Sequence, residues 1–306
     1  MSGRRASNQL GAAVLLKCFQ YLGRFPQSAK EVPEPVISYI STQLSLTADN
    51  YANYDWQSRR ATYDRSDIRK LLGFRETGKA DHEYLSEWLS EHEIMQDNHN
   101  YTVLRDILYQ YLLEQKLEPP TPAQIKRIIN SALYRFETRF FAETLHALPR
   151  SSQLALDEWL YTGKENEGFH QSLFATLKYD PGTIGVKSLF AEAQKLKALQ
   201  AINLPQNLFE HIGSAVLDRY RRRAETEAPR ELRRHPSERR YTLLACFCQQ
   251  RQQEVSDNLV NLLIQLIHRM ESRAEHKVER DFIRESKKRM NKSRLLYRIA
   301  SAALEN

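Results

Sequence analysis

Residues 54–75 of the chain group side chains that suit contact with phosphates and with the edges of bases. Read as a helix over about 58–72, at roughly 100° per residue, this stretch presents an outward face that is cationic, aromatic and hydroxylic. That face carries Arg59, Tyr63, Ser66 and Lys70, with Arg60, Arg65 and Arg69 at its margins. Arg and Lys neutralise phosphates, Tyr and Ser donate to phosphate oxygens, and Arg reads guanine in a groove that admits a helix. The alternative is that this basic helix face contacts only solvent.

The opposite flank of this helix is apolar, which predicts that it packs on a core through Ala61, Ile68, Leu71 and Leu72. Before it we expect one helix from Pro33 and a short second helix capped by Thr47. Their apolar spacing matches a helix-turn-helix, and an ordinary helical corner fits equally well. Placed directly before a basic helix, the pattern favours a compact DNA-binding bundle over residues 1–75.

A second basic helix is expected after residue 120. Thr121, Pro122 and Gln124 supply an N-cap, a proline at the first helical position and a capping-box partner. With the apolar residues turned inward, the helix leaves a second basic set exposed: Lys126, Arg127, Arg135 and Arg139. DNA contact and plain solvation explain this set equally well.

An arginine-rich run follows at residues 219–240, with nine arginines against four glutamates. Arginine forms bidentate contacts with phosphate, and the run contains no lysine. A solvated linker or an exposed helix is the alternative interpretation. The candidate DNA contacts in this run are Arg221, Arg222, Arg223, Arg233 and Arg234.

Charge is segregated along the 306 residues. The net charge of +7 is moderate, yet residues 1–75 hold 11 Lys and Arg against 6 Asp and Glu, whereas residues 76–118 hold 3 against 10. Such segregation favours a directed cationic face over a diffuse surplus.

Few prolines and glycines interrupt the chain, and residues 237–306 contain neither. Alternating β-branched runs are absent, so the predicted class is all-α, with consecutive helical bundles that lead into long helices. We expect helical domains over 1–75, 76–150, 151–235 and 236–306.

Cys18, Cys246 and Cys248 form no CxxC motif and are expected to be buried thiols. In the last domain, Leu259, Leu262, Leu263, Leu266 and Met270 repeat at helical spacing, which indicates core packing or, as the alternative, a subunit seam.

No catalytic or cofactor motif stands out. The chain lacks GxxxxGK[ST], GxGxxG and HExxH, and its histidines and cysteines do not have zinc-site spacing. We therefore predict no catalytic residues, no metal site and no cofactor in this chain. The first ten residues lack the apolar region of a signal peptide, and no run approaches eighteen apolar residues.

Several separate motifs resemble one family. They are QLGAAVLLKCFQYLGRFP at 9–26, YDWQSRRATYDRSDIRKLLGFRE at 54–76, EPPTPAQIKRIINSALYRFE at 118–137, and the stretch 204–280. In this order they are similar to the N-terminal third of the transposases of class II replicative bacterial transposons, the cointegrate-forming Tn-three type. The chain departs from the family's usual residues at Ser58, Arg60 and Tyr63, which leaves the basic helix intact.

The resemblance implies a function and a location. With the missing signal region and membrane span, which predict a cytoplasmic protein, it implies a bacterial protein, associated with the nucleoid, that binds the double-stranded terminal inverted repeats through successive helical modules. It also implies that the Mg²⁺-dependent, RNase-H-like catalytic region lies beyond Asn306, so this chain alone should cut nothing. The alternative is a helical regulatory module that assembles transposase subunits or competes with the full-length protein.

Overall fold

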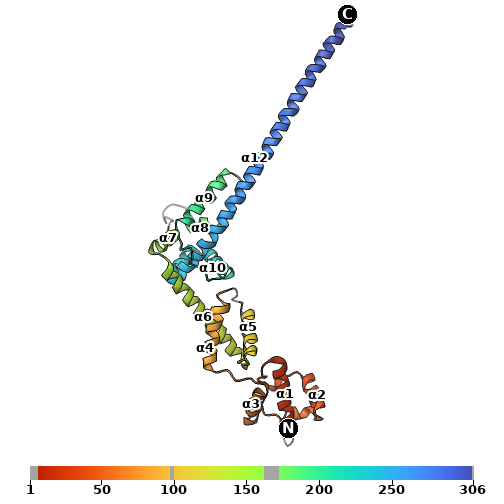
Figure 1. Ribbon diagram of the computed structural model, residues 1–306, viewed down its shortest axis with the longest axis vertical. Coiled ribbons are helices and arrows are strands. Elements are labelled where there is room, and N and C mark those ends of the chain that lie inside the picture. The colour runs from red at the N-terminus through yellow and green to blue at the C-terminus, as the bar shows by residue number, and fades with distance from the viewer. Residues whose placement is uncertain (1–5, 97–99, 162–171, 305–306) are drawn as a thin grey trace. The chain divides into compact units, whose positions relative to one another are not determined.

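The computed structural model describes residues 6–96, 100–161 and 172–304 (Figure 1). Within these ranges the chain forms no strand, only one isolated bridge between Arg75 and Leu117. The predicted all-α class is therefore confirmed. The helices are α1 (Ala6–Leu22), α2 (Glu34–Gln43), α3 (Arg59–Leu72), α4 (Lys79–Trp88), α5 (Tyr101–Glu114), α6 (Pro122–Ala147), α7 (Arg150–Tyr161), α8 (Leu173–Leu177), α9 (Val186–Gln200), α10 (Ser214–Thr226), α11 (Pro229–Arg234) and α12 (Ser237–Leu304).

The chain separates into two compact units. Unit 1 comprises Met1–Phe140 with His211–Val216, and unit 2 comprises Phe141–Glu210 with Leu217–Asn306. The boundary after Phe140 falls inside α6, which is a single helix from Pro122 to Ala147. The finer division into four domains at residues 75, 150 and 235 stays a prediction.

The first half of unit 1 runs from α1 to α3. Helix α1 is its central element, because apolar side chains on two faces of this helix are buried. One face packs with α2 and the 3-10 turn η2 (Ala48–Tyr51), and the other packs with α3. The first cluster contains Leu10, Val14, Cys18, Val32, Ile40 and Tyr51, and the second contains Leu15, Phe19, Phe25, Tyr54, Ala61 and Ile68.

The side chain of Tyr54 fixes the approach of α3 to α1. Its ring lies so close to Gly11 that a Cβ atom there would overlap it. Its hydroxyl group donates a hydrogen bond to Asp64 Oδ2 over 3.1 Å. Burial and the adjacent Asp64 carboxylate both raise the pKa of Tyr54, so the phenol stays protonated and remains a donor.

A short bridge joins the two halves of unit 1. The Arg75 N–H donates to Lys116 O over 3.0 Å, and the Glu118 N–H donates to Arg75 O over 2.8 Å. The Arg75 guanidinium forms a bidentate pair with Asp81, at 2.6 and 2.7 Å. Asp81 also accepts the Gly78 N–H over 2.8 Å at the start of α4, so one carboxylate both caps α4 and holds the bridge.

Replacing Asp81 with Asn is expected to lower the free energy of unfolding of unit 1 by about 1 kcal/mol at pH 7. Arg75 and the Gly78 N–H lower the pKa of Asp81 from 3.8 to about 2. Because the folded-state pKa is depressed, the stabilisation is present above 3.8 and is lost as the pH falls through about 2. Urea denaturation of both proteins at pH 7, 4 and 2.5 should show the gap closing below pH 4. A gap that does not change with pH would contradict this role.

The second half of unit 1 is built from α4, α5 and α6 around a leucine- and isoleucine-rich core that includes Leu85, Leu108 and Ile125. At the start of α6, the Thr121 N–H donates to Gln124 Oε1 over 2.9 Å, and the Gln124 N–H donates to Thr121 Oγ1 over 3.4 Å. The predicted capping box is therefore confirmed.

The first turns of α12 lie at the centre of unit 2. Every side chain from Tyr241 to Cys248 is buried, because helices of this unit, α7 and α9 among them, pack around this stretch. Cys18 in unit 1 and both Cys246 and Cys248 here are free and buried, as predicted. Burial raises the pKa of Cys248 to about 12, which keeps this thiol protonated and unreactive at neutral pH.

Further along α12 the predicted core packing of the apolar repeat is wrong in part. Leu262 is buried, whereas Leu263 and Met270 are exposed. Helix α9 is the main partner of α12, and the last buried apolar side chain on α12 in the described residues is Leu262. From Arg269 to Ala300 every side chain is exposed except the half-buried Ser286.

Candidate nucleic-acid interface

Helix α3 is set by a capping residue at each end. Ser58 Oγ accepts the Ala61 N–H over 3.2 Å, which satisfies one of the free donors of the first turn. Gly73 ends the helix in the left-handed region at φ 73°, and the Phe74 N–H returns to Arg69 O over 2.8 Å. Arg69 and Lys70 lie in the last turn, where the helix dipole favours cations.

The buried flank of α3 differs from the predicted one. Ala61 and Ile68 are buried as expected, but Leu71, expected in the core, is 72% exposed, and Asp64 is buried instead. Asp64 lies inside because Tyr54 donates to it and Arg60 Nη2 lies 3.1 Å from its Oδ1. Hydrophobic periodicity does not register a carboxylate that is satisfied in this way.

The outward face of α3 carries the cationic and aromatic set predicted from the sequence. Arg59, Tyr63 and Lys70 are exposed, and Ser66, on the same face, is half-buried. In the part of the chain that the structure describes, neither Arg59 nor Lys70 lies within ion-pair distance of a carboxylate. Their charges are therefore available to an external anion.

The three margin arginines of α3 are turned toward the protein to different extents. Arg60 pairs with Asp64, while Arg65 is half-buried, and its Nε is buried with no hydrogen-bond partner in the described ranges. Arg69 is 2.5 Å from Glu118 and 3.3 Å from Glu76. Burial raises the pKa of Glu118, and Arg69 opposes that shift. Arg60 and Arg69 thus anchor the helix and leave its outward face to Arg59, Tyr63 and Lys70.

The segment before α3 contains a single 3-10 turn, η2, where the sequence predicts a short second helix of a helix-turn-helix. Tyr51 at the end of this turn is buried in the cluster around α1, and it stacks edge-on with Trp56 at 5.9 Å. The turn therefore belongs to the core between α1 and α2.

Helix α6 exposes three of its four predicted basic residues. Lys126, Arg127 and Arg135 are exposed, without a carboxylate within ion-pair distance in the described residues. Arg139 is half-buried and donates to Glu91 Oε1 over 2.8 Å and to Ser90 Oγ over 3.2 Å. It links α6 to the π-helical turn η3 (Leu89–Glu93) and acts within the fold.

A shallow hollow of about 380 Å³ lies where α4 meets α6 within unit 1. It is lined by Lys79, His82, Glu83, Ser86, Gln124, Arg127, Ile128, Ser131 and Arg135. Three cations and two hydroxyl groups face one carboxylate, so the hollow suits an anionic group with several acceptor oxygens.

The arginine-rich run of unit 2 is largely neutralised by its own acids. Arg221, 15% exposed, is 2.9 Å from Asp218, 2.7 Å from Glu225 and 3.1 Å from Glu254. Arg222 pairs with Asp218 over 2.7 Å and Arg223 with Glu227 over 3.4 Å.

The other two candidates of this run lie on α11. Arg233 lies over the ring of Tyr161, 5.1 Å from its centroid, which is a cation–π contact. Arg234 is exposed. Of the five predicted contacts in the run, Arg234 therefore keeps the most freely available charge.

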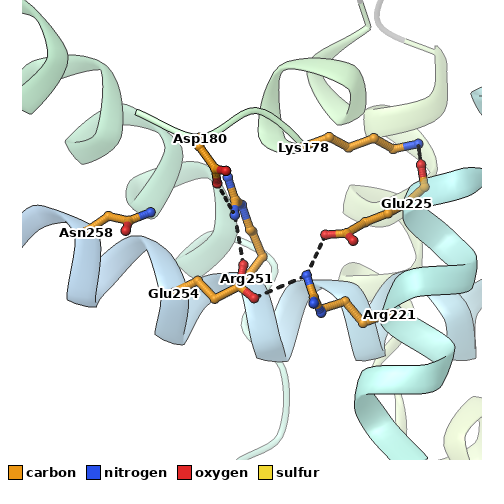
Figure 2. A pocket seen from close by; sticks show the side chains of 7 residues that line it. All are labelled: Lys178, Asp180, Arg221, Glu225, Arg251, Glu254 and Asn258. Atoms are coloured by element: carbon orange, nitrogen blue, oxygen red, sulfur yellow. Dashed lines mark hydrogen bonds and ion pairs between the residues drawn. The ribbon is translucent and has the colours of Figure 1, made fainter. Parts of the chain in front are cut away.

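A polar hollow of about 470 Å³ beside Arg221 shows the same internal pairing (Figure 2). Its lining places Arg221, Arg251 and Lys178 against Asp180, Glu225 and Glu254. Lys178 Nζ donates to the backbone oxygens of Glu225 and Glu227, both over 2.7 Å. Burial lowers the pKa of Lys178 against the opposing effect of nearby glutamates. The residues that line the hollow therefore form a network of internal ion pairs and hydrogen bonds that joins α8, α10 and α12.

The described ranges show neither a metal cluster nor a membrane span. They contain no group of three or more His, Cys, Asp or Glu side chains placed to hold a metal ion. None of their helices combines the length and the apolar character that crossing a lipid bilayer requires.

Comparison with known proteins agrees with the motif resemblance. A family model described as a domain of unknown function (DUF4158) matches residues 1–132. The chain is 26% identical over 302 residues to the transposase for transposon Tn501 of Pseudomonas aeruginosa, and the match covers 99% of this chain and 30% of that protein. It is homologous to the N-terminal part of Tn-three-type transposases.

Two further relatives from Escherichia coli show the same extent of similarity. The transposase for transposon Tn3926 is 23% identical over 302 residues, and the transposase for transposon Tn21 is 22% identical over 306 residues. Each match covers 99% of this chain and 30% of the relative. The chain thus spans about 30% of the length of the curated relatives that it matches.

The matched region 1–132 contains α3 and most of the hollow between α4 and α6. Two residues of that hollow, Lys79 and His82, were not predicted as contacts. They lie in the acidic stretch 76–118, which holds 3 Lys and Arg against 10 Asp and Glu. A helical projection of 79–88 turns Asp81 and Glu87 away from these two residues and leaves Glu83 beside them, since the average charge of a segment does not describe each of its faces.

Proposed function

We propose that the chain binds double-stranded DNA at the terminal inverted repeats of a transposon, as the end-recognising part of a transposase. The observation that carries this proposal is the outward face of α3, where Arg59, Tyr63 and Lys70 are exposed and neither cation is paired within the described residues. A capped helix anchored by Arg60 and Arg69 presents these side chains in a fixed geometry, which base-edge readout requires.

The hollow between α4 and α6 supplies the second contact of the proposal. Lys79, Arg127 and Arg135 would hold phosphates, and such contacts set register without carrying sequence information. With six to ten phosphates engaged, the affinity should fall about 10³- to 10⁵-fold between 50 and 200 mM salt.

Footprinting tests the proposal directly. The probe is a labelled duplex with the inverted repeat that ends the element encoding the chain, beside a scrambled duplex of the same composition. We expect protection of the repeat alone at 150 mM salt. Equal protection of both duplexes would contradict sequence-specific end recognition.

That this chain alone does not cleave DNA stays a prediction. Incubation of the chain with the labelled repeat and Mg²⁺ tests it, and any specific nick would overturn it.

Self-association is a second candidate function, favoured by exposed apolar side chains on α12. Val278, Phe282 and Leu296 are each more than half exposed and lie near one another on a helical projection. Light scattering over a range of protein concentrations tests this candidate. A mass equal to one chain at all concentrations would remove it.

A further inference from the structure

The distal part of α12 carries a straight line of cations. Between Arg269 and Arg298, basic residues recur at intervals of three, four or seven, which follow the period of the helix. The line consists of Arg269, Arg273, Lys277, Arg280, Arg284, Lys287, Arg294 and Arg298, and we call it the α12 stripe. At about 100° per residue all eight fall within roughly 100° of arc, over a length of about 44 Å.

The acids of the same segment lie off the stripe. The five acids are Glu271, Glu275, Glu279, Asp281 and Glu285, and the helical projection places all of them outside the arc of the stripe. Like charges consequently stand four residues apart, as in Arg269, Arg273 and Lys277. Such pairs destabilise a helix, whereas an ordinary solvated helix gains by alternating opposite charges at this spacing. The segment therefore keeps one face free of acids, while Lys288, Arg289 and Lys292 lie off the stripe.

The charges of the stripe are not neutralised within the protein. All eight side chains are exposed, and none has a carboxylate partner in the described part of the chain. Two side chains of the stripe donate hydrogen bonds to uncharged backbone oxygens: Arg269 donates to Ile184 O over 2.9 Å and Arg280 to His276 O over 3.0 Å. Arg221, Arg222 and Arg223 differ, because each has an acid within ion-pair distance.

We infer that the α12 stripe binds the phosphate backbone of duplex DNA without reading its sequence. A duplex presents one negative charge for about every 1.7 Å of its axis, and its major groove admits an α-helix, so a continuous basic helix can contact the phosphates on the groove walls. A straight helix of about 44 Å cannot follow a whole turn of the groove, so only part of the stripe touches one duplex.

Duplex DNA fits the stripe better than a lipid surface does. A helix that lies in a membrane interface buries its opposite face among acyl chains. Here the opposite face mixes Val278 and Phe282 with Glu271, Glu275 and Glu279, and burying those carboxylates is costly. DNA is taken as the ligand because of the function proposed above; the stripe belongs to unit 2, whereas the residues proposed to read the repeat belong to unit 1.

A matched pair of variants of the full chain tests the stripe. The stripe variant carries Arg273→Gln, Lys277→Gln and Arg284→Gln. The control carries Lys187→Gln, Lys197→Gln and Arg289→Gln, which removes the same charge from exposed positions of unit 2 off the stripe. Glutamine keeps helix propensity high, and circular dichroism checks that the helix content of both variants is unchanged.

The readout is the affinity for a labelled 40-bp duplex of random sequence and for the repeat duplex, each titrated over a range of NaCl concentrations. We expect the stripe variant to lose on the order of 100-fold in affinity for both duplexes at 100 mM NaCl. The slope of log affinity against log salt should become shallower by about 2.7, and the control should change little.

Each alternative predicts a different result in these titrations. An unchanged salt slope, or a loss confined to the repeat duplex, would overturn the inference. Unchanged DNA affinity together with lost self-association, or with lost binding to phosphatidylserine vesicles, would overturn it in favour of a protein or lipid partner. The proposed end recognition is judged separately, by the ratio of repeat to random affinity in the unmodified chain. That ratio can equal one while the stripe still binds DNA.

Discussion

Reversal of charge at Arg59 and Lys70 is expected to abolish preferential binding to the terminal repeat. Both side chains are exposed, lie on the outward face of α3 and have no carboxylate partner in the described residues, so the exchange removes external contacts and adds repulsion. Loss of two such contacts should cost about 2 to 6 kcal/mol, on the order of 30-fold to 10⁴-fold in affinity. Gel-shift titration of Arg59→Glu/Lys70→Glu on repeat and scrambled duplexes measures this loss.

Two controls separate a lost contact from a damaged helix. Lys70 lies in the last turn of α3, where a glutamate opposes the helix dipole, so Arg59→Gln/Lys70→Gln is measured in parallel. Lys17→Glu/Lys30→Glu makes the same charge change at exposed positions of unit 1 outside α3. We expect a reduced affinity in the first control and nearly full affinity in the second. Repeat binding that survives the Arg59 and Lys70 reversal would exclude α3 as the contact face.

Local signals predicted much of unit 1 correctly. The helix expected over about 58–72 is found at Arg59–Leu72, because Ser58 and Gly73 act as caps whatever lies around them. The Thr121 and Gln124 capping box is equally local. Interactions between residues close in sequence are readable from the sequence because the helix geometry alone brings them together.

Long-range pairing accounts for the errors at the candidate site. Asp64 is buried because Tyr54, ten residues away, donates to it, and Arg69 is drawn inward by Glu118, 49 residues away. Periodicity cannot show such partners, so it placed Leu71 inside and Arg69 at the margin of the outward face. The neutralised arginines of α10 were more readable, since Asp218 and Glu225 stand at the spacing of helical ion pairs with Arg221.

The position of the acids determines which cations remain available to a ligand. A basic run in sequence becomes an external charge only if acids do not share its face. Residues 219–240 are dense in arginine but interleaved with acids at three or four residues. The α12 stripe is less dense, yet its acids lie on another face. Face-resolved charge therefore identifies the available surface better than local composition does.

Substitution of Arg251 with Met is expected to destabilise unit 2 by about 3 to 5 kcal/mol. The side chain is 4% exposed, and its guanidinium reaches from α12 to the end of α8 (Figure 2). Nε donates to Leu177 O over 2.8 Å, and Nη2 donates to Tyr179 O over 2.5 Å. Leu177 O belongs to the last turn of α8, where backbone acceptors have no intrahelical partner, and Tyr179 O follows the helix.

The two carboxylates around Arg251 should contribute less than these carbonyls. Asp180 is 83% exposed and Glu254 is at the surface, so water screens both ion pairs. Met fills a similar volume but leaves the buried oxygen of Leu177 without its charged donor. Lysine keeps the charge and cannot serve several acceptors in a plane, so Arg251→Lys should recover only part of the stability.

Hydrogen exchange locates the effect where a single melting temperature would average it over both units. In Arg251→Met, amides of α8 and of the start of α12 should exchange faster, while those of α1 and α3 keep their protection. Arg222→Met is the matched control, because that exposed side chain has one surface ion pair and should cost below about 1 kcal/mol. Equal loss of protection in both variants would contradict a special role for Arg251. A loss limited to Arg251→Met would show that one guanidinium holds α8 against α12.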